Sequence, residues 1–278
     1  GPERVSDGEA QRGPVTRLGG RVLGGIEYVG GMTLLTVRAL AGTWRGLIRP
    51  TGRGRRAALI AQMNRVGAKS LGIVCLVQLF IGVILALQMA PPLEEPFKQS
   101  QMIANIIGIA GFRMLGPIIT AVVLSGFAGA SIAAELGTMV VGEEIQALEA
   151  HALNPVRFLV VPRVLATTVM TVLLTVIADW MIAIGGYITA YLVLKPKVYV
   201  GYWDRMRSQL QLRDFLSGLI LAAVFGVLIS AIACFEGLRV RGGPEGVGRA
   251  TTMTVVYSIV GIIVAACVFT MIFYVFEF

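Results

Sequence analysis

Five long apolar stretches dominate this chain and limit what it can fold into. Crossing the hydrocarbon core of a bilayer takes about 20 mostly apolar residues, and runs of that length occupy residues 67–90, 114–141, 158–194, 215–236 and 252–276. Only 14% of the 278 residues are charged, against about a quarter in a soluble domain. We therefore predict an all-α integral membrane protein with about five transmembrane helices. The third run is longer than one span needs, which leaves a tilt, a kink or a re-entrant pair open.

Basic residues are concentrated at the start of the chain. Twelve of the 24 Lys and Arg residues precede position 70, which is typical of a cytoplasmic flank. With a cytoplasmic N-terminus and five spans, 17 basic residues lie inside and 7 outside. The outer loop from Lys195 to Arg213 is more basic than this rule favours. The uneven distribution of the basic residues thus indicates an orientation in a membrane. It also accounts for the net charge of +8, so no nucleic-acid partner is expected.

The part of the chain before the first run has no segment long enough to span. Residues 1–14 are polar, and we expect them to be disordered. Residues 15–65 are predicted to form an N-terminal interfacial amphipathic helix followed by a basic loop at 49–56 that faces anionic lipid. A loosely ordered basic leader is the alternative. Residues 66–278 form the predicted transmembrane domain.

The second run has small residues spaced four apart in two adjacent rows. Such rows allow another helix to approach to backbone contact, so we expect this face to pack against a helix. The rows are Ser125, Gly129, Ala133 and Gly137, and Gly126, Ala130 and Ala134. Spacing leaves open whether the partner helix belongs to this chain or to a second copy. Glu135 lies near the end of the same run, where an acid is either half solvated or bonded to a neighbouring backbone.

A short charged segment at 142–155, GEEIQALEAHALNP, separates the second run from the third. A helix through it has one apolar stripe, formed by Val141, Ile145, Leu148 and Ala152. Pro155 disfavours helical geometry at Asn154 and is expected to end the helix there. The pattern predicts a surface helix of about three turns, although a plain solvated connector explains the charges equally well.

The residues that support most catalytic sites are missing. His151 is the single histidine, so no pair of histidines can hold a metal, and neither the G-x-x-x-x-G-K-[ST] nor the G-x-S-x-G spacing occurs. The three cysteines lie inside apolar runs and suit small buried side chains. We expect no metal site and no catalytic group in this chain.

Two further features admit more than one interpretation. Asp179 lies in the third run, where an isolated acid is costly, and it is either an ion or proton site or a structural hydrogen-bonding group. The glycine-rich segment 236–249 lacks the spacing of a phosphate cradle. Its glycines are interpreted as allowing a tight turn and a close approach to a neighbour.

Three segments of the sequence resemble a known protein family. LGPIITAVVLSGFAGASIAAELGTMVVGEEIQALEAHALNPVRFLVVPRVLA closely resembles the signature region of the MlaE/YrbE permeases, and VGAKSLGIVCLVQLFIGVILALQ and RGGPEGVGRATTMTVVYS also match. These permeases are the membrane subunits of ABC transporters that move phospholipids or other lipids together with MCE-domain proteins. The resemblance covers most of residues 60–275.

The resemblance implies a permease of the bacterial inner membrane that works as a homodimer or beside a paralogous permease. It implies that segment 142–154 is a cytoplasmic coupling helix that docks on a separate ATPase, which carries the ATP and Mg, so that no cofactor belongs to this chain. The candidate coupling residues are Glu143, Glu144, Gln146, Ala147, Leu148, Glu149, His151, Asn154 and Pro155. The candidate lipid contacts, in a cavity between the two subunits, are Ile84, Leu87, Gln88, Arg113 and Met114.

Two positions depart from the family pattern. Many members have an acid at the position of Met114 and an arginine at the position of Phe127. These changes suggest a retuned cavity, a changed salt-bridge partner or a paralogous partner subunit. Two other functions remain open at this stage. One is an ion- or proton-coupled carrier, and the other is a scaffold that recruits an MCE protein without conducting lipid.

Overall fold

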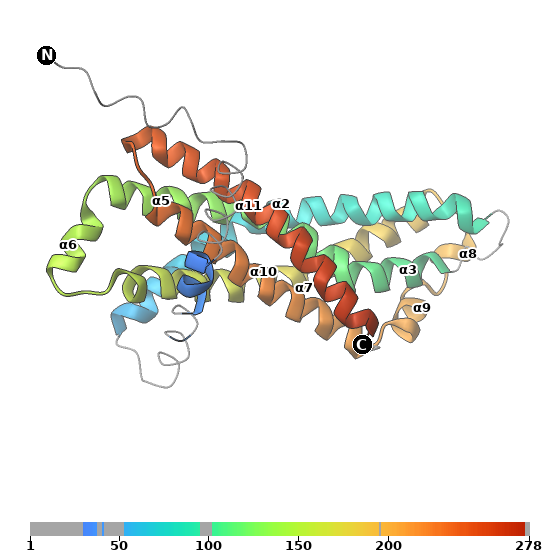
Figure 1. The fold of residues 1–278 in the computed structure, drawn as a ribbon. Helices are drawn as coiled ribbons and strands as arrows, with labels where there is room; N and C mark the ends of the chain where they lie inside the picture. The colour runs from blue at the N-terminus through green and yellow to red at the C-terminus, as the bar shows by residue number, and fades with distance from the viewer. Residues whose placement is uncertain (1–29, 38–40, 42–52, 95–101, 195, 276–278) are drawn as a thin grey trace, which may run out of the picture.

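The structure, a computed structural model, describes residues 30–37, 41, 53–94, 102–194 and 196–275. Within these ranges the chain is helical and contains no strand, which confirms the all-α prediction (Figure 1). The segment 1–14, predicted to be disordered, lies outside the described residues. Residues 30–37, within the predicted interfacial segment, are helical, and Leu35 packs against the bundle.

Five helical segments are long and apolar enough to cross a membrane, as predicted. The first, Leu59–Pro91, lies within α2 (Arg53–Glu94). The second, Ile103–Val141, consists of α3 (Ile103–Ala110), η2 (Gly111–Leu115), α4 (Gly116–Leu124), η3 (Ser125–Gly129) and α5 (Ala130–Val141), where η marks a wider π-helical turn. The third, Val156–Leu192, joins η4 (Val156–Val160) to α7 (Val161–Leu192). The fourth and fifth are α10 (Leu212–Leu238) and α11 (Gly243–Val275). The third apolar run is thus one continuous span and not a re-entrant pair.

Several boundaries differ from the sequence prediction. Helix α2 begins at Arg53, so the second half of the predicted basic loop is helical, and α2 continues through Pro91 and Pro92 to Glu94. Each proline lacks a backbone N–H and leaves a carbonyl of the preceding turn without its helical partner, and α2 ends two residues after Pro92. The second span begins at Ile103 and not at residue 114. The reason is that Arg113 lies inside the helix, where Asp214 supplies a counter-charge.

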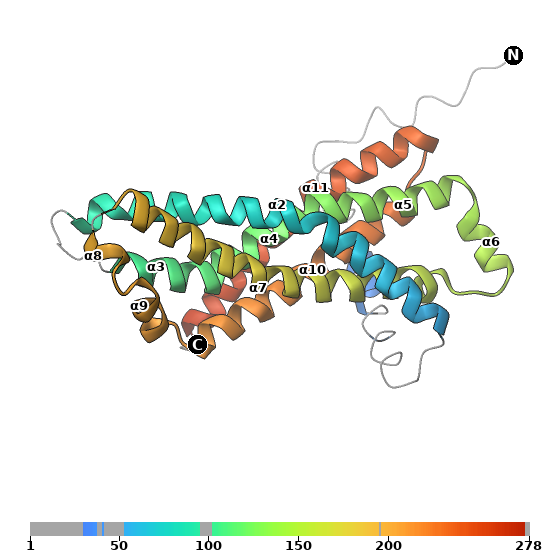
Figure 2. The same ribbon diagram turned by 180° about the vertical axis from the view of Figure 1, so that it is seen from behind.

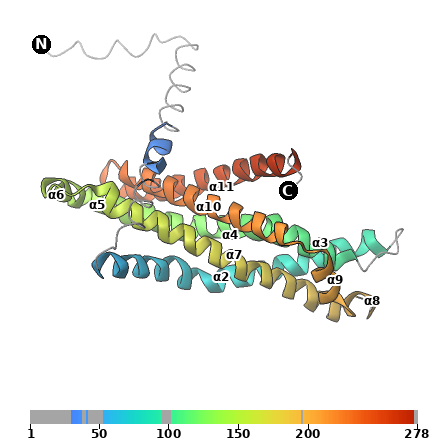
Figure 3. The same ribbon diagram turned by 90° about the horizontal axis from the view of Figure 1, so that it is seen from below.

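The spans pack in layers, with α2 on one side of the bundle, α11 on the other, and α7 and α10 between them (Figure 3). Helix α2 runs along α7 (Figure 2). Their backbones touch, because a Cβ on Gly82 would overlap the carbonyl oxygen of Ile182 and one on Gly185 would overlap that of Leu79. The α10 span is 67% buried, whereas the α11 span is only 17% buried. A single copy therefore leaves large apolar faces on its outer helices.

The two ends of the bundle differ in character. One end, hereafter the α6 end, carries the short helix α6 (Glu144–Ala150) that links α5 to η4 (Figure 1). The opposite α9 end carries α8 (Pro196–Tyr199) and α9 (Tyr202–Gln209). Tyr202 is buried there, and its hydroxyl donates to the carbonyl of Ala183 at 3.3 Å. This contact fixes α9 against α7.

Candidate functional site

The connector between the second and third spans is a helix, but a shorter one than predicted. Helix α6 has 7 residues, which is two turns instead of three. The helix stops at Ala150, before Pro155 can act, because Ala152 adopts a left-handed conformation with φ of 57°. Glu143, just before the helix, has the same left-handed φ of 57°. Two left-handed residues therefore bracket α6 and set it across the ends of α5 and η4.

Only part of the predicted apolar stripe faces the bundle, because Val141 and Ala152 lie outside α6 and are exposed. Ile145 and Leu148 are half-buried and pack against a core cluster that contains Leu136 and Val160. The other predicted coupling residues lie outward: all except Leu148 and the half-buried Pro155 are exposed, namely Glu143, Glu144, Gln146, Ala147, Glu149, His151 and Asn154. The connector thus presents a surface with three glutamates to its surroundings and is seated on the spans by two apolar side chains.

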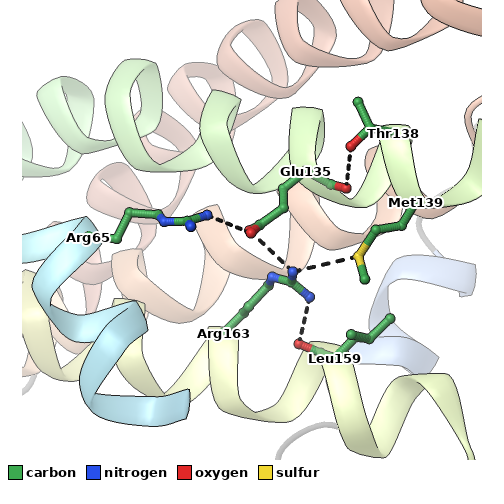
Figure 4. Close-up of polar contacts among 6 residues, drawn as sticks. All are labelled: Arg65, Glu135, Thr138, Met139, Leu159 and Arg163. Atoms are coloured by element: carbon green, nitrogen blue, oxygen red, sulfur yellow. Dashed lines mark hydrogen bonds and ion pairs between the residues drawn. The ribbon is translucent and has the colours of Figure 1, made fainter. Parts of the chain in front are cut away.

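An ion cluster links the first span to the two spans that flank α6 (Figure 4). Arg65 Nη1 of α2 lies 2.5 Å from Glu135 Oε1 of α5, and Arg163 Nη2 of α7 lies 3.2 Å from Glu135 Oε2. One carboxylate thus pairs with guanidinium groups from two other helices. A relative movement of α2, α5 and α7 at this end has to lengthen at least one of these contacts.

Arg163 is the buried member of the ion cluster, with only 8% of its surface exposed. Its Nη1 donates to the carbonyl of Leu159 at 3.2 Å, and its Nη2 lies 4.0 Å from the sulfur of Met139 (Figure 4). A buried cation that loses its counter-ion is strongly destabilising. Glu135 is therefore the group that allows a charged arginine at this depth.

Sequence reasoning missed this cluster, although a signal was present. Glu135 lies six residues before the end of α5 at Val141, and Arg163 lies seven residues after the start of η4 at Val156. Helices joined by a short connector run antiparallel, so nearly equal distances from the connector place two residues side by side. Nothing in the sequence identifies Arg65 as the third member, because it comes from a helix 70 residues away.

A second ion pair lies nearer the α9 end. Arg113 Nη1 of η2 is 3.5 Å from Asp214 Oδ1 at the start of α10, and the guanidinium lies 5.7 Å from the ring centre of Phe273 on α11. Met114 contacts the same helix, with its sulfur 3.8 Å from Thr270 Oγ1. The carboxylate that faces Arg113 is thus provided by α10, while its neighbour in the chain is an apolar methionine.

The candidate lipid contacts fall into two groups that a single copy does not bring together. Ile84, Leu87 and Gln88 lie on the exposed face of α2, where Ile84 is 52% exposed. Arg113 contacts α10, and Met114 contacts α11. Helix α11 lies on the other side of the bundle from α2, with α10 between them (Figure 3).

The two rows of small residues in the second span have different surroundings. A Cβ on Gly129 would lie 3.3 Å from Ile229, and one on Gly137 would lie 2.9 Å from Val240. The first row therefore packs against α10 and its C-terminal turn within the same chain. Gly126, in the second row, is exposed and has no neighbour within 4 Å of an added Cβ among the described residues. Any close partner of Gly126 comes from outside the described part of the chain.

Polar side chains also meet inside the bundle. Gln78 of α2 donates to the carbonyl of Gly116 at 3.0 Å and to Thr120 Oγ1 at 2.9 Å. Asp179 of α7 is 1% exposed, lies against Gly116, and its Oδ1 accepts no hydrogen bond from the described residues. Phe127 and Met114, which depart from the family pattern, lie in the π-helical turns η3 and η2. Such turns occur frequently at functional sites.

These features define a multi-pass membrane protein with a short, largely exposed helical connector, α6, at one end of the bundle. A family model described as Permease MlaE matches residues 59–272, and the chain belongs to the MlaE permease family. It is 36% identical over 207 residues to a "Probable ABC transporter permease protein" of Rickettsia typhi, which covers 74% of this chain and 79% of the relative.

Two other relatives carry more specific names. The chain is 30% identical over 249 residues to the "Intermembrane phospholipid transport system permease protein MlaE" of Haemophilus influenzae, covering 88% of this chain and 91% of that one. It is 31% identical over 242 residues to "Protein TRIGALACTOSYLDIACYLGLYCEROL 1, chloroplastic" of Arabidopsis thaliana, covering 83% and 69%. Relatives with permease names thus occur in bacteria, and one plant relative has a name that describes it as chloroplastic.

Proposed function

We propose that this chain is the membrane subunit of an ATP-driven ABC transporter that moves phospholipid or a related lipid between the membrane and an MCE-domain partner. The observation that carries the proposal is the connector: α6 is exposed on its polar face, yet it is seated on spans that Glu135 ties together. A soluble partner that binds and moves such a segment would also move the three membrane helices that Glu135 connects.

The ATPase is proposed to be a separate polypeptide that grips α6 and holds the ATP and Mg. Glu143, Glu144 and Glu149 are exposed carboxylates on or beside α6, and they suit a groove lined with basic side chains. In this proposal, α6 and the N-terminus lie in the cytoplasm. The opposite α9 end then faces the MCE partner across the inner membrane.

The lipid path is proposed to lie between two copies of the permease, or between this chain and a paralogue. The exposed face of α2 and the open Gly126 are the surfaces available for such a partner. A cavity between two copies would be bordered by Ile84, Leu87 and Gln88 from α2 and, across the interface, by the region of Arg113 and Met114. That arrangement unites groups that one copy keeps apart.

Charge reversal on the connector tests the proposal. Glu144→Lys combined with Glu149→Lys is expected to abolish co-purification of the ATPase subunit and lipid-stimulated ATP hydrolysis. The control is Asp204→Lys with Arg207→Glu, two charge reversals at exposed positions on α9 whose charge changes cancel, and it should leave both intact. Retention of the ATPase and of stimulated hydrolysis by the connector variant would show that α6 is not the docking site.

A second candidate function rests on Asp179, a buried acid whose Oδ1 lacks a hydrogen bond from the described residues. Such a group suits an ion- or proton-coupled carrier. This function predicts lipid transfer that follows a pH gradient without ATP and is lost in Asp179→Asn. Transfer that needs ATP and persists in Asp179→Asn excludes it, and lipid bound in a cavity between two copies excludes a purely scaffolding role.

A further inference from the structure

A separate pocket at the α6 end lies between the end of α10 and the start of α11. Its volume is about 280 Å³, and its walls include three arginines, one glutamate and a tyrosine: Arg239, Arg241, Arg249, Glu236 and Tyr257. None of these residues belongs to the connector or to the candidate lipid contacts. The pocket is therefore distinct from the transport site proposed above.

Glycines in the turn bring the arginines together. Gly242 and Gly243 adopt φ of 88° and 72°, a conformation that favours glycine. A Cβ on Gly246 would overlap the carbonyl oxygen of Arg241, so the first turn of α11 packs directly on the end of the α10 connection. The tight turn predicted for this glycine-rich segment is confirmed. As a result, arginines from both sides of the turn line one pocket.

Two of the pocket arginines differ from the arginines of the bundle that form ion pairs. Arg65, Arg113 and Arg163 each face a carboxylate. By contrast, Arg241 and Arg249 are exposed and have no ion-pair or hydrogen-bond partner among the described residues.

Arg239 lies with its guanidinium 5.0 Å from the ring centre of Phe235. Three positive charges and the single negative charge of Glu236 leave the pocket with a net positive charge. Guanidinium groups recognise phosphate oxygens in a bidentate manner.

The position of the pocket favours a lipid over a soluble anion. Helix α11 opens with the polar stretch GPEGVGRATT and becomes apolar at Met253. At about 1.5 Å per residue, Arg249 lies about 6 Å outside that apolar stretch, which is the depth of lipid headgroups. Met253 and Tyr257 line the pocket on the side of the apolar stretch, and tyrosine is typical of the membrane interface.

We propose that this pocket binds the headgroup of an anionic phospholipid in the leaflet at the α6 end, with Arg241 and Arg249 on the phosphate. Met253 and Tyr257 contact the glycerol region of the same lipid. The bound molecule is a resident lipid that holds the α10–α11 turn at the membrane surface. Gly137 of α5 packs on Val240 of the same turn, so the lipid stabilises the part of the bundle that carries α6.

The test uses the full-length protein in detergent, titrated with phosphatidylglycerol, with phosphatidylcholine of the same chain length, or with inorganic phosphate, and read by native mass spectrometry. The wild-type protein should prefer phosphatidylglycerol at least fivefold over phosphatidylcholine. Arg241→Gln with Arg249→Gln should weaken phosphatidylglycerol binding about 25-fold, because each basic group at an anionic surface contributes about fivefold.

The matched control is Arg207→Gln with Arg213→Gln, which removes two exposed charges from the α9 end and should change the affinity less than twofold. Thermal melting confirms that both double variants are folded. An equal loss in both variants, or no headgroup preference, overturns the proposal. Competition by inorganic phosphate as effective as that by the lipid assigns the pocket to a free anion. If the Arg241→Gln with Arg249→Gln variant binds lipid normally but no longer co-purifies with the ATPase subunit, the pocket is a protein-docking site. Either of these two results contradicts a lipid site.

Discussion

The arginine–carboxylate contacts at the two ends of the bundle differ in the number of groups that take part. At the α6 end, one carboxylate joins two arginines from two further spans, and one of those arginines is buried. Nearer the α9 end, Arg113 and Asp214 form a single longer pair of 3.5 Å, supported by the ring of Phe273. The α6 end thus has one carboxylate shared by two arginines, whereas the second contact is a single ion pair between η2 and α10 with one aromatic ring of α11 beside it. In the proposed transporter, a movement of α6 would therefore be shared among α2, α5 and α7 through the contacts of Glu135.

The largest effect is expected from Glu135→Gln. This change leaves Arg163 buried without a counter-ion, and breaking a buried pair costs about 3–5 kcal/mol. Because the Glu135 side chain is 31% exposed, we expect about 2–3 kcal/mol, measured as a lower midpoint of thermal or denaturant unfolding in detergent. The double variant Glu135→Gln with Arg163→Met removes both charges and should recover at least half of the loss. No recovery would mean that the carboxylate acts independently of Arg163.

Asp214→Asn comes next in size. Asp214 pairs with Arg113 through one oxygen, and its Oδ2 accepts the backbone N–H of Gln211 at 3.2 Å in the cap of α10. Asparagine keeps the capping oxygen and removes the charge, so we expect a loss of about 1 kcal/mol, typical of a partly exposed pair. Unfolding of this variant should be compared with that of Glu135→Gln under the same conditions. A loss as large as that of Glu135→Gln would remove the distinction between the two ends.

Arg65→Gln is expected to have the smallest effect on stability. The Arg65 side chain is 48% exposed, and exposed pairs contribute about 0–1 kcal/mol. Stability should therefore fall by less than about 1 kcal/mol, while lipid-stimulated ATP hydrolysis should fall more clearly because α2 is released from the ion cluster. The exposed Lys69→Gln, one turn further along α2, is the control. Equal hydrolysis in the two variants would exclude a role for Arg65 in coupling.

The sequence predicted the number of spans, the all-helical class and the family, because each depends on features that are contiguous along the chain. Hydropathy locates a span without knowledge of its neighbours, and the signature region is unbroken from Leu115 to Ala166. Features that depend on a contact with a residue far away in the sequence could not be predicted in this way. The start of the second span was placed after Arg113 because its distant counter-ion, Asp214, was invisible in the sequence.

The end of α6 shows the same difficulty on a local scale. Pro155 was the visible stop signal, but the left-handed Ala152 ends the helix earlier. Only one of the two ion pairs at the α6 end can be predicted from the sequence. The offsets of Glu135 and Arg163 from the connector imply that these two residues meet. The pair of Arg65 with Glu135 depends on the packing of α2 against α7, which the sequence does not reveal.

The most direct measurement is lipid-stimulated ATP hydrolysis by the complete complex carrying Glu135→Gln, beside the complex carrying Asp214→Asn. If the α6 end is the coupling junction, Glu135→Gln should retain the ATPase subunit, because α6 is unchanged, and should lose most of the stimulation by lipid. Asp214→Asn should retain the ATPase subunit and should lose less of the stimulation, because the Arg113–Asp214 pair lies away from α6. Full stimulation in the Glu135→Gln complex, at a temperature where it is folded, would contradict the junction.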